Sequence, residues 1–337
     1  MSYEGPIAMP SAAASARVNR FRSLFRTLQG RPLILAHRGD SFHAPENTLE
    51  AARAGWESGA DAWELDVQLT RDGVPIVLHD ESLSRTTDAA ARFANDPRGA
   101  AGWLVSDFDF EEIRPLDAGS WFLDPSGGPR TAARFGTLDS LGSEARARYR
   151  SGMVRVPTLR DALQWTVRCD WLVNVEVKSF PNTDPRLVEA VLAVIDATGA
   201  ADRVLISSFD HAEVARVAAR RPEIATGVLA ATPLHRPEFY ARALVRADAY
   251  HPSTLVLGAG ADRYRRAPSS RSLRADDLAA LGRAGVPTLV YTVNDTLPGG
   301  LAAHLVEAGA FGLFTDDPRA MVGLFRAGGA RSDREGR

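Results

Sequence analysis

The stretch AWELDVQLTRDGVPIVLH, residues 62–79, determines how the predicted strands of this chain can be arranged. It contains β-rich runs at 62–67 and 74–79, and only TRDG lies between ELDVQL and VPIVLH. A parallel crossover takes about a dozen residues or more, so these runs are predicted to pair as an antiparallel hairpin. Asp72-Gly73 supplies the turn.

Seven more β-rich runs alternate with helical patterns along the chain. They are 33–36, 171–177, 203–209, 225–230, 248–253, 287–293 and 311–316. Alternating strands and helices predict a parallel sheet of the α/β class. Since the run at 74–79 belongs to a hairpin, eight strands remain, which is the number of a (β/α)8 TIM-type barrel with an added β-hairpin.

The segments outside this pattern suggest a single barrel domain with additions. We expect the barrel over residues 31–325, with a small insertion or cap at about 89–155. Residues 1–30 are predicted to form a tail and an amphipathic helix, and 326–337 a disordered tail. The helix, at 17–29, gathers four apolar residues on one face and either lies on a membrane surface or closes one end of its own domain. They are Phe21, Leu24, Phe25 and Leu28.

The composition of the 337 residues narrows the function classes. The net charge of −2 gives no reason to expect nucleic acid as a partner. One cysteine, Cys169, excludes an internal disulfide and fits a reducing compartment. The chain has neither a long apolar run nor an N-terminal pattern typical of a signal peptide, so we expect a cytoplasmic protein. Its oligomeric state stays open.

Polar residues lie where the predicted strands end, and in (β/α) barrels the active site is at the carboxyl ends of the strands. Glu64 and Asp66 are two residues apart on a strand and point to the same face. Glu176 ends another strand, and the hairpin places His79 opposite Glu64 or Asp66, depending on its register. Converging carboxylates repel one another unless a cation separates them, and oxygen ligands favour Mg²⁺ or Ca²⁺.

Two histidines and two cations accompany these acids. His37 ends the first strand, directly before Arg38, and a pair of imidazoles can act as base and acid. Lysine and arginine together number 40, and Lys178 is the only lysine. A compact ammonium suits a crowded site beside a metal or a phosphate better than the arginine fork does.

The motifs resemble those of the glycerophosphodiester phosphodiesterase family. The resemblance rests on LILAHRGDSFHAPENTLEAARAGWESGADAWELDVQLTRDGVPIVLHDESLSRTTD, followed in order by VPTLRDAL, LVNVEVK, VLISSFD, LVYTVN and GLFTDDP. It covers about residues 33–320, apart from the insertion. The resemblance implies a barrel, one divalent cation (Ca²⁺ or Mg²⁺), and hydrolysis of small-molecule glycerophosphodiesters to glycerol 3-phosphate and an alcohol.

The resemblance also implies roles for individual residues. His37 and His79 would be the acid/base pair, and the metal carboxylates would be Glu64, Asp66 and Glu176. Arg38 and Lys178 would hold the phosphate, with Glu46 orienting Arg38 or the metal ligands. Phe209 and Tyr291 could form an apolar wall for the alcohol, or simply pack in the barrel.

Three alternatives remain open at this point. The first is a lysophospholipase D or sphingomyelinase D-like enzyme acting on lipids, which the amphipathic segment and the insertion would favour. The second is a non-catalytic phosphodiester-binding barrel. The third is a barrel glycosidase that uses Glu64 and Glu176 without a metal.

Overall fold

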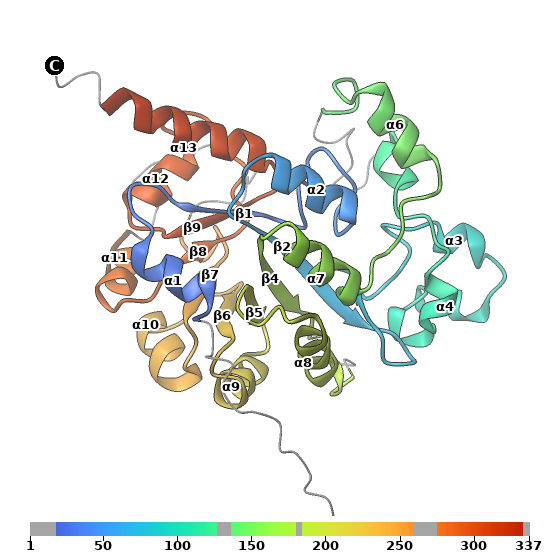
Figure 1. The fold of residues 1–337 in the computed structure, drawn as a ribbon, viewed down its shortest axis with the longest axis horizontal. Coiled ribbons are helices and arrows are strands. Elements are labelled where there is room, and N and C mark those ends of the chain that lie inside the picture. Colours follow the sequence, from blue (N-terminus) through green and yellow to red (C-terminus); the bar gives the residue numbers. More distant parts are fainter. Residues whose placement is uncertain (1–17, 127–135, 180–183, 259–274, 333–337) are drawn as a thin grey trace, which may run out of the picture.

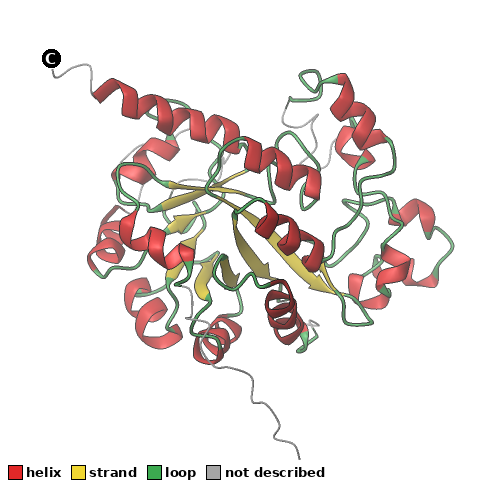
Figure 2. Ribbon diagram, in the orientation of Figure 1, coloured by secondary structure: helices red, strands yellow, loops and turns green. Residues whose placement is uncertain are grey.

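The computed structural model describes residues 18–126, 136–179, 184–258 and 275–332. Eight parallel strands form a nearly closed barrel with helices around it (Figures 1 and 2). The strands are β1 (Leu33–Ala36), β2 (Ala62–Leu69), β4 (Leu172–Val177), β5 (Val204–Ser208), β6 (Ala225–Ala230), β7 (Ala249–Pro252), β8 (Leu289–Val290) and β9 (Gly312–Thr315). The predicted barrel is confirmed.

The strand register explains how the sheet closes. The strands are joined in the order β7-β6-β5-β4-β2-β1-β9-β8, and single bridges Tyr250–Thr288 and Ser253–Tyr291 connect β7 to the β8 segment. When the residue pairing is followed from strand to strand once around the barrel, it returns to β1 at a position eight residues before the starting residue. This displacement is the shear of a TIM barrel.

The hairpin that reduces nine runs to eight barrel strands is present. β3 (Pro75–Val77) pairs antiparallel with β2, with Val67 opposite Val77. Continued by two residues, this register brings His79 level with Leu65. The expectation that His79 lies opposite Glu64 or Asp66 was therefore wrong by one position, because the turn geometry and not the acid spacing sets the register.

Three of the described helices that cover the barrel, α2, α7 and α9, begin at a side-chain cap. In α7 the Thr158 hydroxyl accepts from the backbone N–H of Asp161, and the Asp161 carboxylate accepts from that of Thr158. The surrounding helices are α2 (Leu49–Glu57), α7 (Leu159–Arg168), α8 (Leu187–Thr198), α9 (His211–Arg220), α10 (Pro237–Phe239), the π-helix η4 (Tyr240–Val245), α11 (Ala275–Arg283), α12 (Leu301–Glu307) and α13 (Pro318–Ser332).

The last helix is longer than predicted. α13 continues through residues 326–332, which we expected in a disordered tail, while 333–337 lie outside the described residues. Met321 and Val322 are buried against the barrel. Once packing fixes the first turns of a helix, each further residue adds a backbone hydrogen bond at low cost. A polar, glycine-containing end can therefore remain helical.

The amino-terminal end of the barrel is closed by α1 (Arg20–Thr27), the amphipathic segment. Phe21 is fully buried among apolar residues that point into the barrel, and Leu24, Phe25 and Leu28 pack against the same group. Burial of one such ring stabilises the fold by about 1.5–3 kcal/mol. We expected the apolar face of this helix to contact either a membrane or its own domain, and it packs against its own domain.

The insertion contributes a second core beside the barrel. Its apolar cluster includes Phe108 and Phe122 and extends to Ala51 of α2 and Ile76 of β3. In Figure 1, α3, α4 and α6 lie on one side of the barrel, near α2. The described elements are α3 (Ala89–Arg92), η1 (Pro97–Ala101), η2 (Val105–Asp107), α4 (Phe110–Ile113), η3 (Ser120–Leu123) and α6 (Ser143–Arg150).

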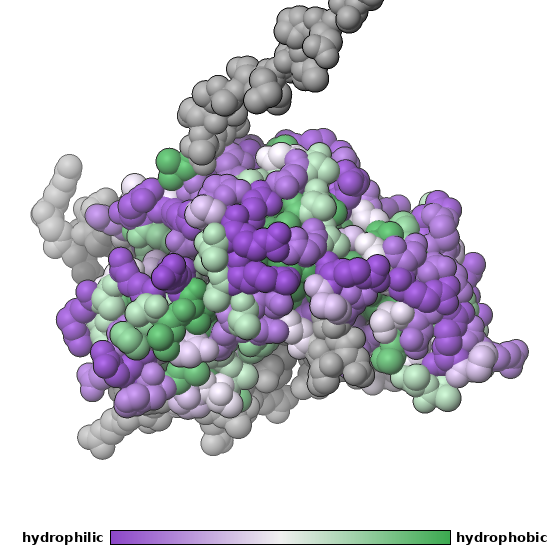
Figure 3. Space-filling model, turned by 90° about the horizontal axis from the view of Figure 1, so that it is seen from below, coloured by the Kyte–Doolittle hydropathy of each residue, from purple (hydrophilic) through white to green (hydrophobic). Residues whose placement is uncertain are grey.

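The described surface carries mainly hydrophilic side chains on the face shown in Figure 3, with hydrophobic residues in separate small groups. Among the residues that the structure describes, no helix combines the length and the apolar character that crossing a bilayer requires. The cellular location stays a prediction from the sequence.

Candidate active site

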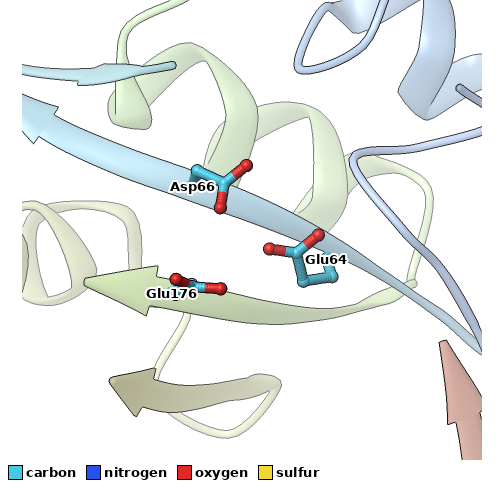
Figure 4. A group of neighbouring side chains, drawn as sticks. All are labelled: Glu64, Asp66 and Glu176. Carbon is cyan, nitrogen blue, oxygen red and sulfur yellow. The ribbon is translucent and has the colours of Figure 1, made fainter. Parts of the chain in front are cut away.

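Three carboxylates meet inside the carboxyl end of the barrel (Figure 4). Glu64 and Asp66 project from β2 on the same face, and Glu176 projects from the neighbouring strand β4, where it pairs in register with Asp66. One oxygen from each acid lies within 4.8 Å of the others. All three side chains are buried, so their charges are poorly screened by water. The acids that the sequence analysis grouped are therefore close together.

Lys178 lies between two of these acids. Its Nζ is 2.8 Å from Asp66 Oδ1 and also contacts Glu176 Oε1. The lysine side chain is 8% exposed, so it is a buried ammonium enclosed by carboxylates. Although burial alone would lower the pKa of Lys178, Asp66 and Glu176 raise it above its ordinary value. The single lysine of the chain is held charged at this point.

Arg38 contacts the acids through both its backbone and its side chain. Its backbone N–H donates to Glu64 Oε2 over 2.9 Å, and its Nε is 3.3 Å from Asp66 Oδ2. The residue has a φ of 59°, and Gly39 follows with a φ of 80°. A Cβ on Gly39 would lie 2.4 Å from the carbonyl carbon of Ala51, so the turn after β1 needs glycine there.

The acid cluster has the features of a cation site. Glu64 Oε1 is buried and has no hydrogen-bond partner among the described residues. Burial and the charges of Asp66 and Glu176 raise the pKa of Glu64 well above its ordinary value. Burial would also raise the pKa of Asp66, but Lys178, His79 and Arg38 lower it well below its ordinary value. Three carboxylate oxygen donors, one of which, Glu64 Oε1, has no hydrogen-bond partner among the described residues, fit the ligand preference of a hard divalent cation.

His37 lies on one side of the cluster. Its Nδ1 is 2.7 Å from Asp316 Oδ1, and its Nε2 is 3.9 Å from Glu64 Oε2. Asp316 is itself fixed, because Asn294 Nδ2 donates to its Oδ2 over 2.7 Å and Ser41 Oγ donates to its Oδ1 over 3.2 Å. A carboxylate at Nδ1 favours the proton on that nitrogen and turns Nε2 towards the acids.

His79 is oriented in a similar way from the end of the hairpin. Its Nδ1 is 2.6 Å from Asp80 Oδ1, and its side chain is 31% exposed. Although burial would raise the pKa of Asp80, hydrogen bonds from His79 and Arg85 lower it below its ordinary range. Both imidazoles of the candidate site therefore have a carboxylate at Nδ1.

Glu46 contacts Arg38 and is not one of the three converging acids. Its Oε1 is 2.6 Å from Arg38 Nη1, and Arg85 donates to both of its oxygens. Of the two roles that the sequence left open for Glu46, orientation of Arg38 is the one that these contacts support.

Phe209 and Tyr291 lie together at the ends of β5 and β8. Their rings meet edge to face, with centroids 6.1 Å apart. Phe209 is 43% exposed, whereas the Tyr291 hydroxyl donates to the backbone oxygen of Ala230 over 3.0 Å. Phe209 therefore presents apolar surface to solvent at the carboxyl end of the barrel, and Tyr291 supports it from within.

Four residues that were not predicted support the site. Asp316, Asp80 and Arg85 contact the histidines or Glu46, and Asn47 Nδ2 donates to Asp66 Oδ2 over 2.7 Å. A signal was available for two of them, since Asp316 ends a predicted strand and Asp80 directly follows His79.

His251 shows that a histidine at a strand end need not take part in catalysis. Its ring is fully buried beside Phe314, with centroids 5.3 Å apart. Neither ring nitrogen has a hydrogen-bond partner among the described residues, and burial lowers its pKa to about 3. It is thus a neutral packing residue at ordinary pH.

A separate groove of about 1250 Å³ lies outside the barrel, between α2, α6 and α7. Its lining includes Arg53, Tyr149 and Trp165 but none of the acids or imidazoles described above. The chemistry of the buried acids, and not the volume of a groove, identifies the candidate site.

Comparison with known proteins gives a consistent picture. The model of the glycerophosphoryl diester phosphodiesterase family matches residues 37–320. The chain is 31% identical over 299 residues to a glycerophosphodiester phosphodiesterase of Caldanaerobacter subterraneus subsp. tengcongensis, and the match covers 88% of this chain and 99% of that protein. It is 30% identical over 290 residues to one of Bacillus altitudinis, with coverages of 86% and 96%.

A solved structure supports the same fold. It is that of an Oleispira antarctica phosphodiesterase in complex with the product sn-glycerol-3-phosphate, with a TM-score of 0.67 and 24% sequence identity. The match covers 88% of this chain and 97% of that chain. At 24% sequence identity, this structural similarity is evidence for the fold alone.

Proposed function

Because the chain belongs to the glycerophosphoryl diester phosphodiesterase family, a family of hydrolases, we propose that it hydrolyses glycerophosphodiesters such as glycerophosphocholine and glycerophosphoethanolamine. The products would be glycerol 3-phosphate and the alcohol. One observation carries the proposal: three buried carboxylates converge beside two buried cations, and two carboxylate-supported imidazoles accompany them. The product named for the Oleispira antarctica structure is compatible with this substrate class.

The residues that would hold the metal are Glu64, Asp66 and Glu176. A bound Mg²⁺ or Ca²⁺ supplies Lewis-acid polarisation of a phosphoryl oxygen. The unsatisfied Glu64 Oε1 supports this assignment, since an unpartnered carboxylate oxygen is costly to bury. Lys178 compensates the charge of Asp66 and Glu176, and its ammonium lowers the pKa of Asp66.

Arg38 and Lys178 would bind the phosphate. Both are buried and charged, and in a poorly hydrated site their attraction for an anion is much stronger than in water. Arg38 can offer a planar donor pair to two phosphate oxygens, whereas Lys178 acts as a point charge.

His37 and His79 would move the protons. One imidazole accepts the proton of the attacking hydroxyl as its oxygen bonds to phosphorus, and the other donates a proton to the alkoxide as its bond to phosphorus breaks. The carboxylates at the two Nδ1 atoms stabilise the charged imidazolium that each role requires at one stage. Phe209, with Tyr291 behind it, would give the alcohol an apolar wall.

The lipid-directed alternative is not favoured. The amphipathic segment was one of its two supports, together with the insertion, and the apolar face of that helix packs against the residues that close the barrel. The glycosidase and binding-protein alternatives lack a comparable observation, because neither accounts for two imidazoles each supported by a carboxylate.

Release of glycerol 3-phosphate tests the proposal. A panel of glycerophosphodiesters is incubated with the protein, with and without EDTA, and then with Mg²⁺ or Ca²⁺ added back. We expect release that EDTA abolishes and one of the ions restores. Absence of product from every diester would overturn the proposed substrate class. Full activity in EDTA would overturn the proposed requirement for a metal ion.

A further inference from the structure

We propose that Arg85 is a positioning residue of this site, which holds His79 and Arg38 in place through the two carboxylates between them. The inference rests on the function proposed above. Arg85 lies in the loop between β3 and α3, and its side chain is 22% exposed.

The guanidinium of Arg85 binds two carboxylates at once. Its Nη1 is 3.0 Å from Glu46 Oε2, and its Nη2 is 2.7 Å from Glu46 Oε1. Its Nη2 also lies 3.0 Å from Asp80 Oδ1, and its Nε donates to Asp80 Oδ2. Each acid is therefore held by two hydrogen bonds, a pattern that fixes orientation as well as position.

Each carboxylate has a second partner in the candidate site. Asp80 Oδ1 is 2.6 Å from His79 Nδ1, and Glu46 Oε1 is 2.6 Å from Arg38 Nη1. A continuous chain of ionic hydrogen bonds thus connects the imidazole of His79 to the guanidinium of Arg38. Arg85 is its central member, and it contacts neither of these two residues directly in the bonds described.

The planar fork of arginine is required for this role. A lysine at the same position could keep the positive charge, but a single ammonium cannot supply four directed donors to two carboxylates. Glu46 is 1% exposed at its side chain, so it cannot turn to water when one partner is lost. It would shift towards Arg38, and Asp80 would lose the bonds that fix it behind His79.

The experiment compares Arg85→Lys with Arg98→Lys. Arg98 is a matched control, because its guanidinium also bridges two carboxylates, Asp96 and Glu112, with a side chain that is 25% exposed. For each variant we would measure the kcat for glycerophosphocholine and, by calorimetry, the affinity for glycerol 3-phosphate. The melting temperature reports on the fold.

Arg85→Lys should lower kcat by about 10- to 100-fold, because small displacements of catalytic groups have effects of this size. It should also weaken binding of glycerol 3-phosphate by about tenfold through the displaced Arg38. Arg98→Lys should leave both quantities within about twofold, as expected for a partly exposed ion pair. A purely structural role would lower the amount of folded enzyme without changing the affinity of the folded fraction.

Equal kcat and equal affinity in the two variants would overturn the inference while leaving the proposed function intact. A wild-type protein that releases no glycerol 3-phosphate would overturn the proposed function, and this inference with it. If Arg85→Lys fails to fold, Arg85→Ala is assayed with added guanidinium or ammonium. Restored affinity with guanidinium alone supports the positioning role, and equal behaviour of the two ions refutes it.

Discussion

Replacement of Asp316 by asparagine is the most informative single change, because it alters the proton position on His37 while the size of the side chain is kept. The two oxygens of this carboxylate have different neighbours: Asn294 Nδ2 donates to Oδ2, whereas His37 Nδ1 and Ser41 Oγ lie at Oδ1. An asparagine has one carbonyl oxygen and one amino group. To keep the bond from Asn294, the carbonyl must stay at the Oδ2 position.

In the Asp316→Asn variant, the amino group of the new side chain then faces His37 Nδ1, which has to accept a hydrogen bond. The proton of the neutral imidazole moves to Nε2, the nitrogen that faces Glu64. The variant also loses the negative charge that stabilises the imidazolium. The same change in Ser-His-Asp triads lowers kcat about 10⁴-fold, and general acid–base catalysis is worth about 10²–10⁴-fold, so we expect a loss in this range.

The assay is turnover of glycerophosphocholine at saturating metal, with the melting temperature as a check on folding. Asp317→Asn is the matched control, because Asp317 is the next residue and its carboxylate accepts from the backbone N–H of Ala320 in α13. Asparagine caps a helix about as well as aspartate. The control should retain activity, and an Asp316→Asn variant with similar activity would refute the assigned role of His37.

Three further outcomes are expected. His37→Ala or His79→Ala should lower kcat about 10²–10⁴-fold, and near wild-type turnover in either would remove that histidine from the mechanism. Lys178→Arg should be impaired although the charge is kept, because the buried space between Asp66 and Glu176 fits an ammonium; full activity would show that the lysine is incidental. Burial would lower the pKa of His43, but Asp40 raises it above its ordinary value. The pair therefore stabilises the fold most when the pH is below about 6.5, the pKa of histidine in the unfolded chain. This stabilisation is lost as the pH rises through the pKa of His43 in the folded protein. His43→Gln should therefore lower the melting temperature more at about pH 5.5 than at about pH 8.5, and an equal loss at both would contradict this reasoning.

The strands and the acids could be predicted from the sequence because their signals are local. Apolar runs mark the strands, the short TRDG connection excludes a parallel crossover, and the spacing of Glu64 and Asp66 places both on one face. Glu176 could be added because the carboxyl ends of parallel strands share one end of a barrel.

The pairing of most supporting residues could not be predicted because it joins positions that are distant in the chain. Asp316 ends a predicted strand, but it lies 279 positions from His37, and residue spacing does not indicate that this aspartate meets that imidazole. The double role of Arg85 depends equally on the relative placement of two loops. The register of the hairpin and the length of α13 were set by turn geometry and by helix propagation, which residue spacing does not report.

The proposed chemistry depends on the binding of one divalent cation by Glu64, Asp66 and Glu176. Anomalous diffraction from crystals soaked in Mn²⁺ tests it directly, since Mn²⁺ accepts the same oxygen ligands as Mg²⁺. We expect one strong peak at about 2.0–2.6 Å from an oxygen of each of the three acids. No peak there, or a peak bound elsewhere in the barrel, would contradict it.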